Sequence, residues 1–136
     1  MQYDFGKQLE AIAARTKIKM DLVVRKFCFD MFSDIMMASP VDTGAFRGNW
    51  MLSVGSPNLT TNASAALPND GAALGAINAA VAASVGKDAI GKTIFFTNSM
   101  PYAYRLEHGW SKQAPAGMVA VTVAGYQSNL DKALGV

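Results

Sequence analysis

The stretch Ser39–Trp50, SPVDTGAFRGNW, separates two segments of different periodicity. Pro40 disfavours helical geometry in the residue before it and cannot donate a hydrogen bond to the preceding turn, so a helix arriving from the N-terminal side ends here. Asp42 and Thr43 can bond to nearby backbone NH groups, and Gly44 can take positive φ. The stretch therefore predicts a turn that leads from a helix into a strand.

Apolar residues at helical spacing precede this turn, from about Phe5 to Met37, and charged residues occupy the opposite face. The pattern predicts one long amphipathic helix. Such a helix is long for so small a domain. We therefore expect part of it either to extend along a neighbouring subunit or to break near Arg15-Thr16-Lys17.

An alternating pattern follows the turn, in GNWMLSVG. It places Trp50, Leu52 and Val54 on one face of a strand. The residues from about 56 to 70 are rich in Asn, Thr, Ser, Ala and Pro, which predicts a loop or flexible excursion.

Four further elements complete the chain. An Ala-rich, weakly amphipathic helix is expected between Asn69-Asp70 and Gly86, with Leu74, Ile77, Val81 and Val85 at helical spacing. The segment KTIFFTN predicts a second strand. A helical turn ending at Gly109 should follow, and the tail from Met118 fits a helix better than a strand. The expected fold is α+β, with the long helix packed on a small antiparallel sheet.

Composition limits the class of protein. The chain has 136 residues, 51% of them hydrophobic and 16% charged, which fits one domain over residues 1–136 with apolar surface reserved for neighbouring subunits. A formal net charge of +2 is too small to argue by itself for nucleic-acid binding. No stretch reaches the roughly 18 uninterrupted apolar residues that a membrane helix needs. The single Cys28 fits a reducing compartment and a core position, and the N-terminus lacks the pattern of a secretory signal.

Catalytic chemistry has one candidate, Asp42-Thr43-Gly44, the tripeptide found at the catalytic turn of aspartic proteases. One copy per chain would require a dimer, in which two carboxylates share a proton. That turn needs an apolar strand leading into it, whereas here a helix and Pro40 precede it, so we interpret the tripeptide as structural. His108 is the only histidine, and neither metal-binding nor phosphate-loop motifs are present, so no metal and no cofactor are expected.

Two segments together resemble signatures of the tailed-bacteriophage tail-completion proteins, a head–tail joining or minor tail component family. SPVDTGAFRGNW is similar to the family's turn-and-strand signature, and TNSMPYAYRLEHGWSKQAPAGMV is similar to its second signature. Trp110 stands where family members commonly have a small polar residue. The matching positions are Pro40, Val41, Asp42, Thr43, Gly44, Arg47, Trp50, Asn98, Tyr102, Ala103, Glu107, Gly109 and Pro115.

The resemblance implies a non-enzymatic virion protein, made in the host bacterial cytoplasm, that forms a ring at the neck of the phage. Sixfold or twelvefold symmetry is expected, with the head connector, tail-terminator or tail-tube proteins as partners and phage DNA passing through the lumen. A tail terminator ring is the close alternative, and a stand-alone nucleic-acid binder or an Asp42 protease belongs to other classes.

The resemblance also supplies roles for individual residues. Asp42 would fix the turn by capping it or by pairing with Arg47, and Glu107 would make a charged contact with Arg105 or Arg47. The aromatic residues would be interface anchors. Those aromatic residues are Trp50, Tyr102, Tyr104 and Trp110.

Overall fold

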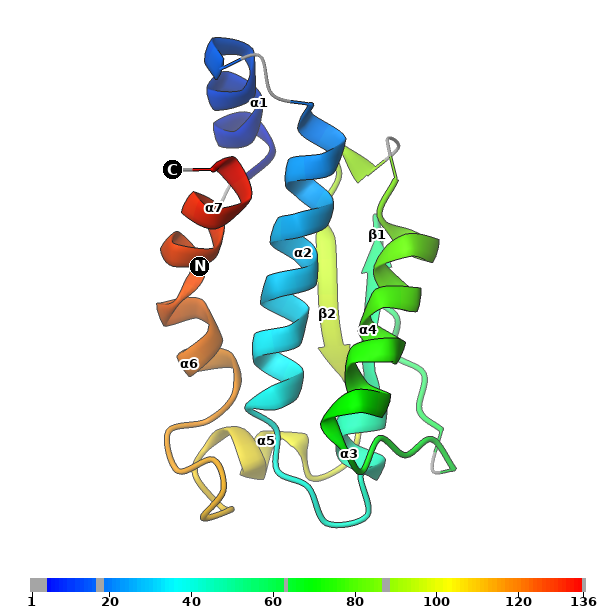
Figure 1. The fold of residues 1–136 in the computed structure, drawn as a ribbon. Coiled ribbons are helices and arrows are strands. Elements are labelled where there is room, and N and C mark those ends of the chain that lie inside the picture. The colour runs from blue at the N-terminus through cyan, green and yellow to red at the C-terminus, as the bar shows by residue number, and fades with distance from the viewer. Residues whose placement is uncertain (1–4, 17–18, 63, 87–88, 136) are drawn as a thin grey trace.

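The computed structural model describes residues 5–16, 19–62, 64–86 and 89–135. It has the α+β architecture that the periodicities predict, with α2 in the middle, a two-stranded sheet behind it, α4 on one side, and α6 and α7 on the other (Figure 1). The elements in chain order are α1 (Phe5–Thr16), α2 (Met20–Met37), α3 (Ala45–Gly48), β1 (Trp50–Val54), α4 (Asp70–Ser84), β2 (Ile94–Asn98), α5 (Ala103–Glu107), α6 (Val119–Ala124) and α7 (Tyr126–Leu134).

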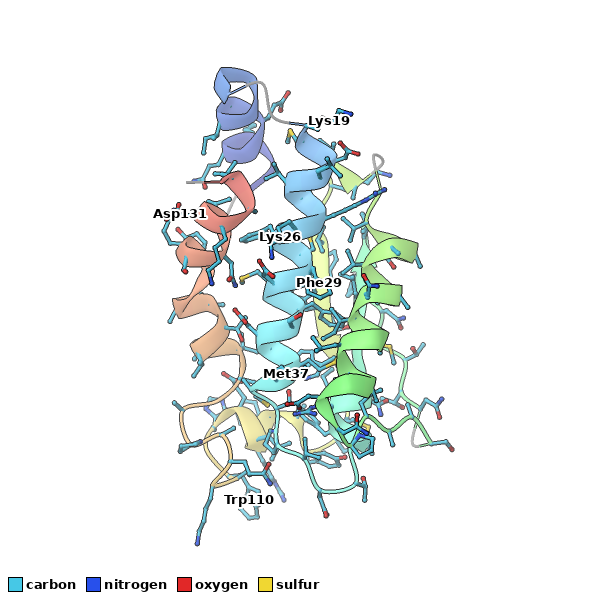
Figure 2. The ribbon with its side chains drawn as sticks, viewed as in Figure 1. Lys19, Lys26, Phe29, Met37, Trp110 and Asp131 are labelled. Atoms are coloured by element: carbon cyan, nitrogen blue, oxygen red, sulfur yellow. The ribbon has the colours of Figure 1, made fainter. Side chains whose placement is uncertain are left out.

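The long N-terminal helix is divided. α1 ends at Thr16 and α2 begins at Met20, so the break expected near Arg15-Thr16-Lys17 is confirmed, although Lys17 itself lies outside the described residues. α2 ends at Met37, ahead of Pro40, and runs from near Lys19 at one end of the molecule to Met37 near the other (Figure 2). It is the central core helix, and its buried residues are Val23, Val24, Phe27, Cys28, Met31, Phe32, Ile35 and Met36.

The two strands are antiparallel, with Leu52 opposite Phe96 in the register. Leu52 and Phe96 pack against the core, and the ring of Phe96 lies 5.2 Å, centroid to centroid, from that of Phe32 on α2. The alternation predicted for residues 50–54 is therefore confirmed. A two-stranded ribbon is marginal in water by itself, so α2 supplies the apolar surface that stabilises it.

α4 begins with Asn69 as its N-cap, whose side chain accepts a hydrogen bond from the backbone NH of Ala72 at 2.8 Å. The helical spacing predicted for Leu74, Ile77 and Val81 is confirmed, but the Leu74 side chain is 44% exposed. Ala73, Ile77 and Val81, at spacings of four, take the line that faces α2, which turns Leu74 outward. Despite its apolar composition, neither α4 nor any other helix in the described ranges is long and apolar enough to cross a membrane.

The loop after β1 is tied to the turn region by Asn49, which is fully buried. The Asn49 side chain accepts from the NH of Asn62 at 2.7 Å and donates to the carbonyl of Asn62 at 3.0 Å. The NH of Leu67 donates to the carbonyl of Gly44 at 3.0 Å. Residues 56–62 and 64–69 are thus a loop, as predicted, and their mobility stays a prediction.

The C-terminal tail is helical, as predicted, but it divides at Gly125 into α6 and α7. α7 packs on α2, where the buried Asn129 side chain donates to the carboxylate of Asp34 at 2.6 Å. Leu130 and Leu134 point into the same core.

Cys28 lies on the buried face of α2, as predicted for a small core residue. Burial raises the pKa of its thiol from 9.0 to about 12, because the thiolate is poorly solvated in this environment. The thiol is therefore protonated, and inert as a nucleophile, at neutral pH.

Candidate functional site

Residues 39–50 and 98–118, far apart in sequence, meet at one end of the molecule, which we call the signature end. The side chain of Asn98 donates to the carbonyl of Phe46 at 2.9 Å, and the ring of Phe46 lies 5.8 Å from that of Tyr102. The Gln113 side chain makes two hydrogen bonds to the backbone of Val41. It accepts from the Val41 NH at 2.9 Å and donates to the Val41 carbonyl at 3.0 Å. The two segments that carry the family resemblance therefore form one surface, and Figure 2 shows Trp110 at this end, away from Lys19.

The turn itself is built by Thr43 and Gly44. The hydroxyl of Thr43 accepts a hydrogen bond from the NH of Ala45 at 3.2 Å. Gly44 has φ of 90° and packs so tightly that an added Cβ would lie 2.6 Å from the backbone nitrogen of Pro68. Glycine is required there twice, for its positive φ and for the close approach of the loop after β1.

The role expected for Asp42 is wrong. Its carboxylate is exposed, and within the described residues it makes no hydrogen bond or ion pair. Arg47, its expected partner, is buried in α3 and instead donates to the carboxylate of Asp70 at 3.1 Å. The reason is topological: α3 turns the Arg47 side chain toward the start of α4 rather than back toward the turn.

The partners expected for Glu107 are also wrong. Its carboxylate accepts hydrogen bonds from the backbone NH groups of Met118 and Val119 at 2.8 Å each and of Ala120 at 3.1 Å. These are NH groups at the start of α6, which have no acceptor within the helix. Glu107 is therefore an intramolecular cap that joins α5 to α6, and a carboxylate suits the positive end of a helix.

Gly109 reverses the chain after α5. It has φ of 82°, and an added Cβ would lie 2.8 Å from the carbonyl oxygen of Pro115. The NH of Trp110 then donates to the carbonyl of Arg105 at 3.1 Å, the long hydrogen bond of a Schellman motif. This geometry places Trp110 beyond the end of the helix, on the surface.

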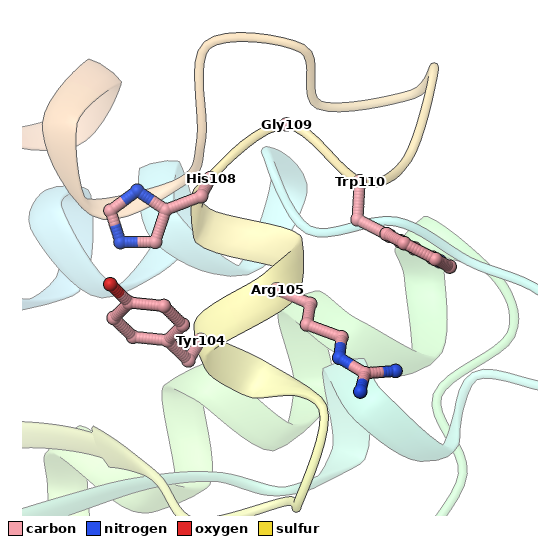
Figure 3. Close-up of a pocket in the computed structure, with 5 residues that line it drawn as sticks. All are labelled: Tyr104, Arg105, His108, Gly109 and Trp110. Atoms are coloured by element: carbon pink, nitrogen blue, oxygen red, sulfur yellow. The ribbon is translucent and has the colours of Figure 1, made fainter.

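The exposed part of the signature end carries two pairs of side chains in contact. Tyr104 and Trp110 are 77% and 73% exposed. The Arg105 guanidinium lies 5.5 Å from the centroid of the Trp110 ring, and the rings of Tyr104 and His108 are 4.2 Å apart. Figure 3 shows one pair on each side of Gly109, lining a shallow depression.

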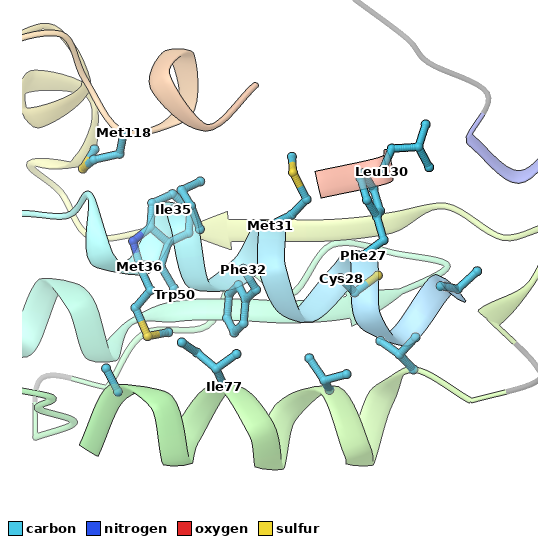
Figure 4. Close-up of a cluster of buried hydrophobic side chains, with 14 of the residues drawn as sticks. Phe27, Cys28, Met31, Phe32, Ile35, Met36, Trp50, Ile77, Met118 and Leu130 are labelled. Carbon is cyan, nitrogen blue, oxygen red and sulfur yellow. The ribbon is translucent and has the colours of Figure 1, made fainter. Parts of the chain in front are cut away.

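Trp50 does not belong to this surface, contrary to the expectation that it is an interface anchor. It is 8% exposed, and its indole NH donates to the Ser39 hydroxyl at 2.7 Å, which itself donates to the carbonyl of Ile35 at 2.7 Å. Figure 4 shows Trp50 among the buried side chains of α2. The alternating pattern of the strand already placed Trp50 on the same face as Leu52 and Val54, which indicated that Trp50 is buried. Tyr102 is exposed, at 39%, although its ring packs on Phe46.

Three polar residues organise this end: Asn49, Asn98 and Gln113. Asn49 and Gln113 were missed in the sequence, and Asn98 was named only as a matching position of the resemblance. All three bond backbone groups far away in the chain, so local pattern gave no signal for their partners. In the ranges the structure describes, no three His, Cys, Asp or Glu side chains gather as metal ligands would. The arrangement is suited to contact through exposed aromatic rings and a cation.

Comparisons with protein-family models, with curated proteins and with solved structures found no match.

Proposed function

We propose that this chain is a structural protein of a tailed-bacteriophage particle, a subunit of an oligomeric ring that joins the head to the tail and lets DNA pass. The observation that carries the proposal is the union of the two signature segments at one end, through the Asn98–Phe46 and Gln113–Val41 hydrogen bonds. Segments that resemble two signatures of one family, and that fold into one surface, are better explained by a shared role than by two chance matches.

The exposed side chains at this end support a contact role. Tyr, Trp and Arg are the residues enriched at interface hot spots. Trp110 and Tyr104 expose most of their area, and each lies against a neighbour that orients it, Arg105 and His108 respectively. Large rigid side chains held in this way lose little conformational entropy when a partner covers them.

The geometry around Asp42 favours this proposal over the protease alternative. Asp42 lies between the end of α2 and the four-residue helix α3, rather than in a turn entered from an apolar strand. Its carboxylate is exposed at the surface and is not braced by hydrogen bonds from within the described chain.

Electron microscopy of intact particles carrying a labelled copy of this chain tests the proposal. We expect density for a ring at the junction of head and tail. Density at the tail end of that junction would assign the tail terminator position instead, and a chain absent from the particle would contradict the proposal.

Variants at the signature end add a functional readout. Tyr104→Ala with Trp110→Ala should reduce the yield of joined head–tail particles, because both anchors are lost while the core is untouched. Leu22→Ala, which also removes an exposed apolar side chain but from the start of α2, is the matched control and should leave the yield unchanged. Equal yields for the unaltered protein, the Tyr104→Ala/Trp110→Ala variant and the Leu22→Ala variant would contradict the assignment of this end as the docking surface.

A further inference from the structure

One exposed cation at the signature end has no partner of opposite charge. The Arg105 guanidinium makes neither an ion pair nor a side-chain hydrogen bond within the described chain. It lies over the Trp110 ring, 5.5 Å from the ring centroid, and both side chains line the depression of about 330 Å³ in Figure 3. Because the described chain gives this guanidinium no acceptor, its NH donors remain available to an acceptor from outside.

The charges around Arg105 are not balanced within the subunit. Glu107 is the only carboxylate among residues 98–118, and three backbone NH groups at the start of α6 already bind it. Lys112 adds a second exposed cation to the same segment. Asp42 is the only carboxylate among residues 39–50, and it makes no ion pair with Arg105. The signature end therefore offers Arg105 no counter-charge of its own.

A partner that covers Trp110 must also remove Arg105 from water, because the guanidinium lies against the indole. Removing a charged group from water is costly unless an opposite charge compensates it. A carboxylate supplies that charge, and its two oxygens match the parallel NH donors of a guanidinium. The position of Arg105 beside Trp110 thus determines which chemical group a partner must bring.

We propose that the protein adjoining the signature end places an aspartate or glutamate side chain on Arg105, while an apolar part of the same segment covers Trp110. The inference rests on the proposed function, in which this end is a docking surface, and names the group that docks there. A strand of DNA is less suited to the site, because it needs a row of cations for its phosphates. Asp42 is exposed at the same end, and the net charge of the chain is only +2.

Zero-length cross-linking of assembled particles tests the pair. Arg105→Lys keeps the positive charge and supplies a primary amine. A carbodiimide condenses this amine with a carboxylate in contact, so that an amide forms and the carbodiimide takes up the water lost and becomes a urea. Mass spectrometry of the digested particles should find position 105 joined to an aspartate or glutamate of another virion protein.

Leu22→Lys is the matched control for the cross-link. It places an amine at an exposed position near the start of α2, and Figure 2 shows that start at the opposite end of the molecule from Trp110. This variant should give no cross-link from position 22 to the protein that position 105 reaches. Particles with the unaltered chain give the background from native lysines such as Lys112.

Exchanging the two charges separates an ion pair from mere proximity. Arg105→Glu should lower the yield of joined head–tail particles several-fold, because two carboxylates then face each other. Arg105 is exposed, so this substitution leaves the core of the subunit intact. Lysine in place of the cross-linked acidic residue of the adjoining protein should restore the yield in combination with Arg105→Glu. Failure to restore it would overturn the inference.

Three other results would also overturn the inference. The first is an assembled particle in which Arg105→Lys gives no cross-link above the Leu22→Lys control, and it would leave the proposed function standing. The second is a cross-link from position 105 to a carboxylate of a second copy of this chain. The third is binding of a single-stranded oligonucleotide by the purified chain that Arg105→Gln abolishes. A chain absent from the particle would instead contradict the proposed function, and the carboxylate partner with it.

Discussion

Trp50 and Trp110 show how differently two tryptophans can serve in one chain. Trp50 follows the turn by a few residues and faces α2, where Ser39 accepts its indole NH. Trp110 follows Gly109 and projects from the surface over Arg105. Both belong to segments that resemble family signatures, yet only Trp110 is available to a partner.

Replacing Trp50 with Phe should lower the free energy of unfolding by about 1–3 kcal/mol. The variant loses the hydrogen bond to Ser39 and leaves a void in the core. Equilibrium urea unfolding measures the loss. Trp110→Phe is the control and should change stability by no more than about 0.5 kcal/mol, because that side chain is 73% exposed. Equal losses in the two variants would contradict the burial assigned to Trp50.

Residues whose role depends on local backbone geometry were predictable, and residues whose role depends on a distant partner were not. Gly44 and Gly109 follow from turn and helix-end chemistry, which spans a few neighbours. Glu107 bonds NH groups more than ten residues away, and Arg47 pairs with Asp70 across the loop after β1. No pattern near either charge identifies its partner.

At the scale of elements, α6 combines a local and a distant contribution. The segment MVAVTV alternates like a strand, yet the tail forms the helix that its longer spacing predicts, and Glu107 binds the first NH groups of that helix. Gly117 makes this possible, because it has φ of 85° and leaves room for the Glu107 side chain.

Gly117→Ala should therefore destabilise the protein by about 2–4 kcal/mol. The added Cβ would clash with the backbone carbonyl oxygen of Glu107 and lie 2.7 Å from its carboxylate, in addition to the strain of positive φ. Gly55→Ala separates the two effects, since Gly55 also has positive φ, 91°, but open space around it. We expect about 1–2 kcal/mol for Gly55→Ala in the same urea titration. A loss at Gly117 no larger than that at Gly55 would argue against the close packing of Gly117 on Glu107.

At the scale of the whole molecule, the core and the uncovered helix faces have opposite requirements. The buried side chains form one cluster centred on α2, so the subunit has a core of its own. The valines of α6 and the face of α4 remain outside that core. The chain therefore folds around one core and leaves these apolar side chains exposed.

Gly75→Ala should stabilise the isolated chain by about 0.5–1 kcal/mol, because alanine is the better helix former and the new methyl group meets no atom of the described chain. Equilibrium urea unfolding measures the gain. A loss of stability in Gly75→Ala would show that the added methyl group disturbs a contact in the folded chain.

The sequence by itself determined where most helices, strands and turns lie, because proline, glycine and hydrophobic period act over a few residues. It predicted that a turn at residues 39–44 follows a long helix. For that helix it left two possibilities, a break near Thr16 or an extension along a neighbouring subunit. Only the tertiary structure decided that Asp42 is unpaired within the described chain, that Glu107 caps α6, that Trp50 is buried and that Leu74 is exposed. The physical reason is that hydrogen-bond partners and burial are set by which distant elements pack together, and that information is not local to any segment.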